Sequence, residues 1–140
     1  MESTTTQAPA SASDAAAGAP RARALKLSVV MPVYNERDTI REALQRVRAL
    51  GENVELVVVD DASTDGTTAI LEAEPGLVLL KHPVNQGKGM AIRTALANVT
   101  GDVVAIQDAD LEYDPRDLLR LMEPIARGEA RVVYGSRFLK

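Results

Sequence analysis

The sequence predicts an α/β fold, in which a mostly parallel sheet carries helices on both of its faces. Short apolar runs rich in β-branched residues alternate along the chain with segments of helical periodicity. Turn-forming residues separate several of these segments, as at Gly51 and at Pro75-Gly76. Polar and acidic residues follow the apolar runs directly, at the points where the chain leaves each strand. Together these observations indicate repeated strand–helix–strand units.

Each predicted strand is a short apolar run. The runs span residues 27–33, 54–59, 77–80, 103–106 and 132–134. A helix is expected after each of the first four, and the first of these helices carries Ile40 and Leu44 on one face. Asn35 and Asp65 are expected to cap the first two helices. Pro124 is expected to perturb the last turn of the fourth.

Composition limits the possible classes of protein. Of the 140 residues, residues 1–24 are rich in Ala, Ser, Thr and Pro and are expected to form a disordered leader, so that residues 25–140 form the one domain. Hydrophobic residues make up 46% and aromatic residues only 3%, which predicts an aliphatic core. A net charge of -4 argues against nucleic-acid binding, and the lack of cysteine excludes disulfides and thiolate metal sites. No apolar run reaches the roughly 18 residues of a membrane span.

Three carboxylates follow the fourth predicted strand at alternating positions: Asp108, Asp110 and Glu112. Carboxylates packed this closely repel one another and need a counter-charge. A divalent cation that carries a phosphorylated substrate supplies one. The segment therefore predicts a metal or phosphate site.

Polar residues also follow the other predicted strands. They are Tyr34, Asn35 and Glu36 after 27–33, Asp60 and Asp61 after 54–59, and Ser136 and Arg137 after 132–134. The carboxyl ends of parallel strands meet at one edge of a sheet, which is where open α/β folds bind ligands. We therefore expect these residues to converge on one site with the three carboxylates.

Several of these residues also have a purely structural interpretation. Asp60 and Asp61 fit a turn, and Glu112 fits the solvated first turn of a helix. Gly87-Lys88-Gly89 lacks the spacing of a phosphate-binding P-loop and favours a helix start with a solvated lysine. His82 stands alone before a proline and is interpreted as a loop residue rather than a ligand or base.

Five segments together resemble family 2 inverting glycosyltransferases. They are Val30 to Glu36, Val59 to Thr67, Asn85 to Gly89, Gln107 to Glu112 and Gly135 to Phe138. Within that family the chain is most similar to the polyprenyl-phosphate (dolichyl-phosphate) mannosyltransferase-like enzymes. The resemblance runs from about Leu27 to Lys140, and the five motifs occur in the family's order.

The resemblance implies an A-type glycosyltransferase fold, a nucleotide-sugar donor such as GDP-mannose or a UDP-hexose, and Mg²⁺ or Mn²⁺. By the family pattern Pro32, Tyr34 and Glu36 hold the base and ribose, and Val59 and Asp61 complete the nucleoside pocket. Asp108, Ala109 and Asp110 match the DxD motif, which binds the donor and its metal, with Glu112 near the metal. Arg137 is expected to meet the donor diphosphate. The implied catalytic residues are Asp108, Asp110 and Arg137.

The implied acceptor is a polyprenyl phosphate (dolichyl or undecaprenyl) or another cell-envelope acceptor. The chain stops just after the predicted strand at 132–134, whereas the family's catalytic domains continue. We therefore expect it to be the amino-terminal part of a longer enzyme. Membrane association through further carboxyl-terminal segments would place that enzyme at the cytoplasmic face of the membrane.

Two other classes of protein stay open. A non-catalytic nucleotide-binding fragment would keep Tyr34, Glu36 and Asp61 without transfer. A phosphoaspartyl protein would use Asp60 or Asp108 as nucleophile, but it needs a lysine after a later strand, where this chain has Arg137. A dinucleotide-binding domain is disfavoured, because no glycine-rich turn follows the first strand.

Overall fold

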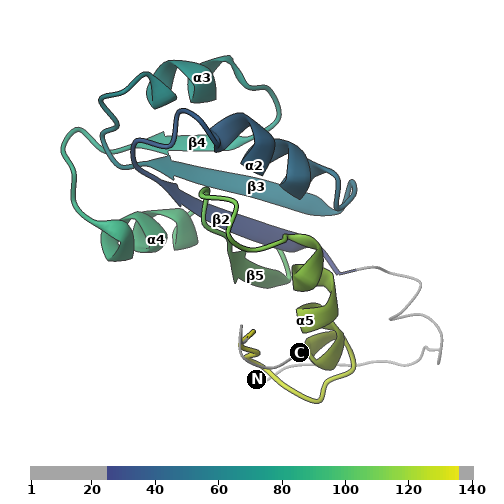
Figure 1. Cartoon of the computed structure of the whole chain (residues 1–140). Coiled ribbons are helices and arrows are strands. Elements are labelled where there is room, and N and C mark those ends of the chain that lie inside the picture. The colour runs from purple at the N-terminus through teal and green to yellow at the C-terminus, as the bar shows by residue number, and fades with distance from the viewer. Residues whose placement is uncertain (1–24, 136–140) are drawn as a thin grey trace.

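The computed structural model describes residues 25–135, which form a four-stranded parallel sheet with helices on both faces (Figure 1). The strands are β2 (Leu27–Val33), β3 (Val54–Asp60), β4 (Val78–Lys81) and β5 (Val103–Ile106), in the order β4-β3-β2-β5. The helices are α2 (Ile40–Arg48), α3 (Thr67–Ala73), α4 (Lys88–Leu96) and α5 (Arg116–Ala126). The predicted α/β class is confirmed.

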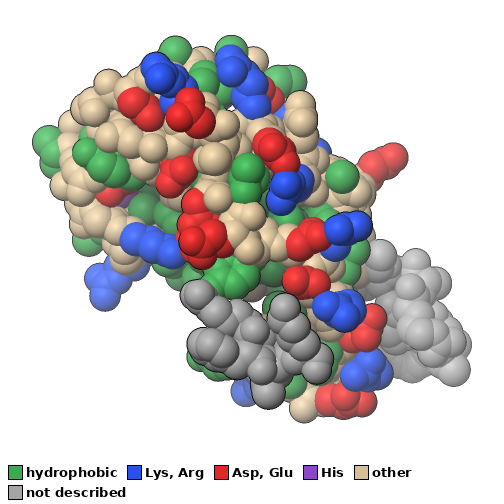
Figure 2. All heavy atoms as spheres, viewed as in Figure 1, with side chains coloured by type: hydrophobic (Ala, Val, Ile, Leu, Met, Phe, Trp, Pro, Cys, Tyr) green, Lys and Arg blue, Asp and Glu red, His purple; other side chains and the backbone are tan. Residues whose placement is uncertain are grey.

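Charged side chains of both signs are interspersed over the surface, with apolar patches between them (Figure 2). Neither sign forms a continuous field on the face shown. Among residues 25–135, no helix is long and apolar enough to cross a membrane. The expected disordered leader, residues 1–24, lies outside the described residues.

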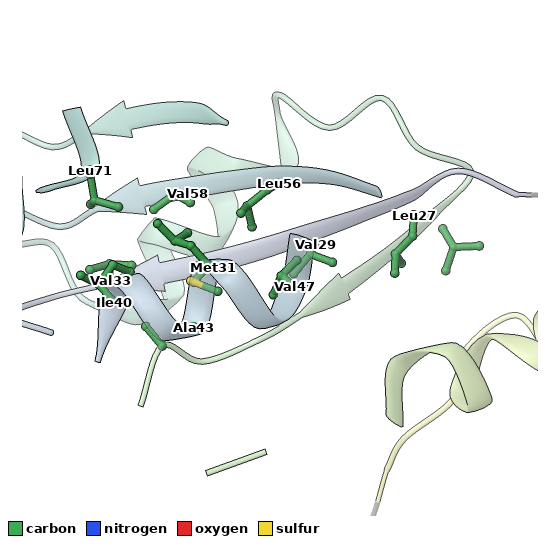
Figure 3. Close-up of a cluster of buried hydrophobic side chains, with 13 residues drawn as sticks. Leu27, Val29, Met31, Val33, Ile40, Ala43, Val47, Leu56, Val58 and Leu71 are labelled. Atoms are coloured by element: carbon green, nitrogen blue, oxygen red, sulfur yellow. The ribbon is translucent and has the colours of Figure 1, made fainter. Parts of the chain in front are cut away.

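The strands alternate their side chains between two apolar clusters, because successive residues of a strand point to opposite faces. The larger cluster lies beneath α2 and α3 (Figure 3). Its strand residues include Leu27, Val29, Met31 and Val33 of β2 and Leu56 and Val58 of β3. The predicted aliphatic core is thus present, and it holds the two central strands in place.

The smaller cluster lies on the opposite face of the sheet, against α4. Val30, Val57 and Val59 pack there on Ala91 and Ala95, which are fully buried. The short alanine side chains allow the helix to approach the strands closely. This close packing holds the first turn of α4 beside the strand ends.

The register of the strands aligns their carboxyl ends, which we call the carboxyl edge of the sheet. Val33 of β2 pairs with Asp60 of β3, which in turn pairs with Lys81 of β4. β5 stops before the end of β2, since its last residue, Ile106, pairs with Val30 and β2 continues to Val33. The chain after β5 therefore runs beside the end of β2.

The expected strand at 132–134 is wrong. Residues 127–135 form turns and irregular chain, and Val132 and Tyr134 are 66% and 89% exposed. A β-carbon built on Gly135 would lie 3.3 Å from Cδ1 of Leu121, so this end of the segment lies against α5. An apolar run becomes a strand only beside a partner strand, and the described segment has none.

Asn35 does not cap a helix, contrary to expectation. α2 begins at Ile40 after Thr39, and Asn35 adopts a left-handed conformation with φ of 53°. Its Oδ1 instead accepts a hydrogen bond of 2.7 Å from the backbone N–H of Thr64. Asp65 does serve the start of α3, because its Oδ1 accepts a 3.0 Å bond from the N–H of Thr67.

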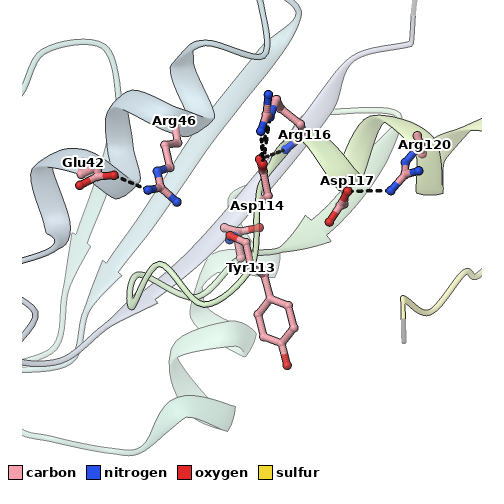
Figure 4. Close-up of polar contacts among 8 residues, drawn as sticks. Glu42, Arg46, Tyr113, Asp114, Arg116, Asp117 and Arg120 are labelled. Atoms are coloured by element: carbon pink, nitrogen blue, oxygen red, sulfur yellow. Dashed lines mark hydrogen bonds and ion pairs between the residues drawn. The ribbon is translucent and has the colours of Figure 1, made fainter. Parts of the chain in front are cut away.

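The start of α5 is held by Asp114, just before the helix. Its carboxylate accepts hydrogen bonds from the backbone and the guanidinium of Arg116 (Figure 4). The side-chain bonds from Arg116 lower the pKa of Asp114 to about 2. α5 continues past Pro124 to Ala126, so the proline is accommodated inside the last turn.

Candidate functional site

A cavity of about 470 Å³ opens at the carboxyl edge of the sheet. Its lining includes Pro32, Tyr34 and Glu36 from the end of β2, Asp61 after β3, and Asp108, Ala109 and Asp110 after β5. Asn85, Gly87, Lys88 and Ala91 contribute from the side of α4. Loops distant in sequence thus meet at one cavity, as the strand-end argument predicts.

The wall after β2 presents an exposed aromatic ring and a carboxylate. Tyr34 is 47% exposed, and Glu36 is half-buried beside it. The next loop fixes this wall, because the N–H of Asn35 donates to Oγ of Ser63 at 2.9 Å. The N–H of Glu36 donates to Oγ1 of the buried Thr67 at 3.1 Å. The ring and the acid therefore sit on a backbone of fixed shape.

Asp61 anchors the part of the wall that residues 85–88 form. Its Oδ1 lies 2.8 Å from Nδ1 of His82 and accepts a 2.8 Å bond from the N–H of Gln86. Its Oδ2 accepts a 2.8 Å bond from the N–H of Gly87. Burial opposes ionisation of Asp61, but these hydrogen bonds outweigh it and hold the pKa of Asp61 below its usual value.

Asp60, the neighbour of Asp61, has a different role. It is 1% exposed, and its oxygens accept hydrogen bonds from the N–H of Ser63 and the hydroxyl of Thr68. The turn interpretation of the acidic pair therefore applies to Asp60, whereas Asp61 lines the cavity.

As expected, His82 lies in a loop and Lys88 begins α4 with an exposed side chain, but both make contacts that the sequence did not indicate. His82 is interior, with a side chain 8% exposed, and it also lies 2.8 Å from Oγ1 of Thr94 on α4. Nζ of Lys88 lies 2.6 Å from Oδ1 of Asp108. The sequence signal that could have placed His82 at the site is its position: it follows β4 directly, so it lies at the carboxyl edge of the sheet.

The segment after β5 is a compact turn. The N–H of Gln107 donates to the carbonyl of Val30 at 2.9 Å, and its side chain donates to the carbonyl of Tyr113 at 3.0 Å. The N–H of Glu112 donates to Oδ1 of Asp110 at 3.1 Å. This turn holds the two aspartates at the cavity.

Thr39 links the two acidic parts of the site. Its Oγ1 lies 2.7 Å from the carbonyl oxygen of Ala109 and 3.0 Å from Oε2 of Glu36. The hydroxyl has a single proton, so it donates to one of these acceptors at a time. The residue just before α2 thereby connects the wall after β2 with the turn after β5.

The donor set fits a cation that is bound partly by its substrate. Among residues 25–135, no three His, Asp or Glu side chains converge closely enough to hold a metal ion by themselves. Mg²⁺ commonly takes one or two protein carboxylates and completes its shell with phosphates and water. Asp108 and Asp110 meet that requirement, whereas Glu112 is not among the residues that line the cavity.

The other predicted residues lie away from the cavity or outside the described chain. Val59 is fully buried in the smaller cluster and does not line the cavity, so the structure offers it no direct contact with a ligand there. Arg137 lies outside the described residues, and its expected contact with a diphosphate stays a prediction.

Comparisons with known proteins agree with this geometry. The chain is 35% identical over 121 residues to the dolichol-phosphate mannosyltransferase of Pyrococcus furiosus, covering 83% of this chain and 34% of that protein. It is 39% identical over 113 residues to the undecaprenyl-phosphate 4-deoxy-4-formamido-L-arabinose transferase of Sodalis glossinidius, covering 73% and 34%. The chain thus spans about a third of the length of these relatives.

A solved structure shares the fold. The mannosyltransferase PcManGT from Pyrobaculum calidifontis, solved in complex with GDP-Man and Mn²⁺, superimposes with a TM-score of 0.59 and 38% identity. The match covers 68% of this chain and 30% of that one, and it confirms the expected A-type glycosyltransferase fold. The sequence pattern of Glycosyl transferase family 2 matches residues 28–140, and the chain belongs to this family.

Proposed function

We propose that the chain forms the donor-binding part of a metal-dependent inverting glycosyltransferase. The enzyme moves a sugar from a nucleotide sugar to a polyprenyl phosphate or another cell-envelope acceptor. One observation carries the proposal: a single cavity holds the exposed ring of Tyr34 and the carboxylates of Asp108 and Asp110. An aromatic face suits a nucleobase, and paired carboxylates suit a metal bound to a diphosphate.

The nucleoside is assigned to the wall after β2. Tyr34 stacks on the base, with Pro32 beside it, and Glu36 accepts hydrogen bonds from the ribose hydroxyls. Asp61 completes this part by holding the facing loop, and Val59 supports it from the core. GDP-mannose and UDP-hexoses are both retained as donors.

The diphosphate is assigned to the acidic turn. Asp108 and Asp110 would hold Mg²⁺ or Mn²⁺, with Glu112 near it, and the ion would supply positive charge for the departing nucleoside diphosphate. Lys88 pairs with Asp108 and is the one lysine or arginine among the described residues that line the cavity, so its ammonium group suits a phosphate oxygen. Arg137 is assigned to the diphosphate, where a guanidinium can bind in a bidentate manner.

The acceptor assignment rests on the relatives, whose names specify dolichol phosphate and undecaprenyl phosphate. The attacking oxygen of a lipid phosphate is already anionic, so the reaction needs no strong general base. Because that acceptor is a lipid, we place the enzyme at a membrane, and we propose the cytoplasmic face, as the family resemblance implies. We assign membrane attachment to segments that correspond to the parts of the relatives outside the match.

Calorimetric titration tests donor binding. UDP-glucose and GDP-mannose are titrated into the chain with Mn²⁺ and again with EDTA, and binding of one donor should require the metal. Asp110→Asn should weaken metal-dependent binding by about tenfold or more. The matched control is Asp117→Asn on α5, an exposed acid outside the cavity that should leave affinity unchanged. Binding of equal strength in EDTA contradicts the metal assignment.

A non-catalytic nucleotide-binding fragment is the second candidate, because Tyr34, Glu36 and Asp61 all line the cavity and would bind a nucleotide without transfer. A transfer assay with undecaprenyl phosphate separates the two, since a fragment binds donor without releasing nucleoside diphosphate. A phosphoaspartyl mechanism on Asp60 is disfavoured, because both its oxygens are hydrogen-bonded in the interior.

A further inference from the structure

His82 joins two parts of the site wall from the inside. Its Nδ1 lies 2.8 Å from Oδ1 of Asp61, and its Nε2 lies 2.8 Å from Oγ1 of Thr94 on α4. Both the imidazole and the Asp61 carboxylate are buried, with side chains 8% and 5% exposed. The ring is therefore bracketed between the end of β3 and the helix that flanks the cavity.

The direction of each hydrogen bond follows from the chemistry of the partners. An ionised carboxylate only accepts, so Nδ1 of His82 must carry the proton that faces Asp61. A hydroxyl both donates and accepts, so Thr94 can donate to an unprotonated Nε2. The arrangement thus selects one tautomer of the neutral ring.

Asp61 in turn ties down the loop that enters α4. The N–H groups of Gln86 and Gly87 donate to its two carboxylate oxygens, and the side chain of Asn85 donates to its carbonyl at 3.2 Å. Gly87 has φ of 95°, a conformation that other residues rarely adopt, and the next residue is Lys88. The position of Lys88 opposite Asp108 therefore depends on how firmly Asp61 is held.

We propose that His82 is a positioning residue: it fixes the Asp61 carboxylate and so holds residues 85–88 at the cavity wall. His82 does not line the cavity and acts through Asp61. The consequence for ligand affinity rests on the nucleotide-binding function proposed above, whereas the positioning itself is measurable in the free chain.

The tautomer of His82 is the first test. His82 is the only histidine in the chain, so its ring nitrogens are identified without ambiguity in ¹⁵N NMR spectra of the 140-residue protein. A protonated Nδ1 supports the proposal. An unprotonated Nδ1 overturns it, because the ring would then have no donor for Asp61.

Amide hydrogen exchange is the second test. In His82→Phe the N–H groups of Gln86 and Gly87 should exchange about tenfold faster, because their acceptor is no longer fixed. The N–H groups of Thr100 and Gly101, which donate to Glu55 and Ser28 at the other end of the sheet, serve as the reference. Equal acceleration of both pairs shows general destabilisation and overturns the proposal.

Rescue by a conservative variant separates positioning from packing. His82→Asn places an amide donor near the position of Nδ1, so exchange at Gln86 and Gly87 should return to within about threefold of the parent. Thr94→Val removes only the hydrogen-bond partner of Nε2, so it should accelerate exchange at Gln86 and Gly87 less than His82→Phe does. If exchange in His82→Asn is as fast as in His82→Phe, the hydrogen bond to Asp61 does not hold the loop, and the proposal is overturned.

Nucleotide affinity connects the positioning role to the site. With Mn²⁺ present, His82→Phe should bind the preferred nucleotide about tenfold more weakly, and His82→Asn should recover most of that loss. If the parent chain binds neither UDP nor GDP, the proposed function fails, and the NMR and exchange results still decide the role of His82. Parent-like affinity in His82→Phe overturns the proposed consequence.

Discussion

Strand β3 has a hydrogen-bonded carboxylate near each end, and the two differ in what they hold together. Glu55, near its start, accepts bonds from the hydroxyl of Ser28 at 2.6 Å and from the N–H and hydroxyl of Thr100 at 2.8 and 2.7 Å. These partners join β3, β2 and the chain entering β5. Asp61, after its end, holds a histidine and a loop beside the cavity.

The difference shows that a carboxylate accepting several hydrogen bonds joins strands at one end of β3 and holds a loop of the site at the other. At the opposite edge of the sheet, where the strands begin, the chain before β5 packs directly on β2: a β-carbon on Gly101 would lie 2.6 Å from Oγ of Ser28. That end is therefore closed by contact between strands. At the carboxyl edge the chain diverges into loops that enter helices, so backbone N–H groups are available and a cavity remains.

Acid should have the largest effect, since it protonates both carboxylates. Burial raises the pKa of Glu55, but its hydrogen bonds outweigh this and lower it from 4.5 to about 2. The pKa of Asp61 is also lowered. Groups with depressed pKa values in the folded state stabilise it fully above their unfolded pKa and lose that contribution as the pH falls. The urea midpoint should therefore fall between pH 4.5 and 2, and a flat midpoint across this range contradicts both assignments.

Removing Asp61 should be the most damaging single change. Asp61→Ala leaves the N–H groups of Gln86 and Gly87 and the ring of His82 without their acceptor, at a cost of about 3 kcal/mol in the free energy of unfolding. Nucleotide binding should also be lost. Urea denaturation measures the first effect, with the exposed Asp38→Ala as control, expected within about 0.5 kcal/mol of the parent. A small cost would mean that loop 85–87 is held by other contacts.

Glu55→Gln should destabilise the fold without affecting the site. The neutral amide loses the charge-assisted bonds from Ser28 and Thr100, at a cost of about 2 kcal/mol. Nucleotide affinity should stay at the parent's value under conditions where the variant is folded. A parallel loss of affinity would show that the two ends of β3 are coupled, which breaks the comparison.

Tyr34→Ala should have the smallest effect on stability and a clear effect on binding. Tyr34 is 47% exposed, so unfolding should change by less than about 0.5 kcal/mol. Affinity for the nucleotide should fall by about 1–3 kcal/mol, the range for stacking of a base on an aromatic ring. Tyr34→Phe keeps the ring and should bind as the parent does, while Tyr134→Ala controls for loss of an exposed tyrosine outside the cavity. Unchanged affinity in Tyr34→Ala removes the base assignment.

The sequence predicted the sheet because its signals are local. Apolar runs, turn residues and helical spacing located β2 to β5 and the helices between them. The same signal failed at 132–134, because a three-residue run does not reveal whether a partner strand lies beside it. Asn35 was misread for a related reason: its oxygen binds Thr64, a partner on a different loop.

The site was predictable in outline and not in its contacts. Strand-end position alone indicated that Tyr34, Asp61 and Asp108 would meet, because parallel strands share an edge. It did not indicate that His82 faces Asp61 or that Lys88 faces Asp108. Those pairs depend on the register of β3 with β4 and on the depth at which α4 packs, which short sequence patterns do not encode.

The central position of β2 bears on the time course of folding. β2 pairs with β3, the next strand in the chain, and with β5, which follows three helices later. Closing the longer loop costs more chain entropy, so β5 should add last, after β2, β3 and β4 have assembled. The half of the cavity built on Tyr34 and Asp61 would then form before the acidic turn arrives. Pulse-labelling exchange should protect the amides between β2 and β3 before those between β2 and β5, and simultaneous protection would exclude this order.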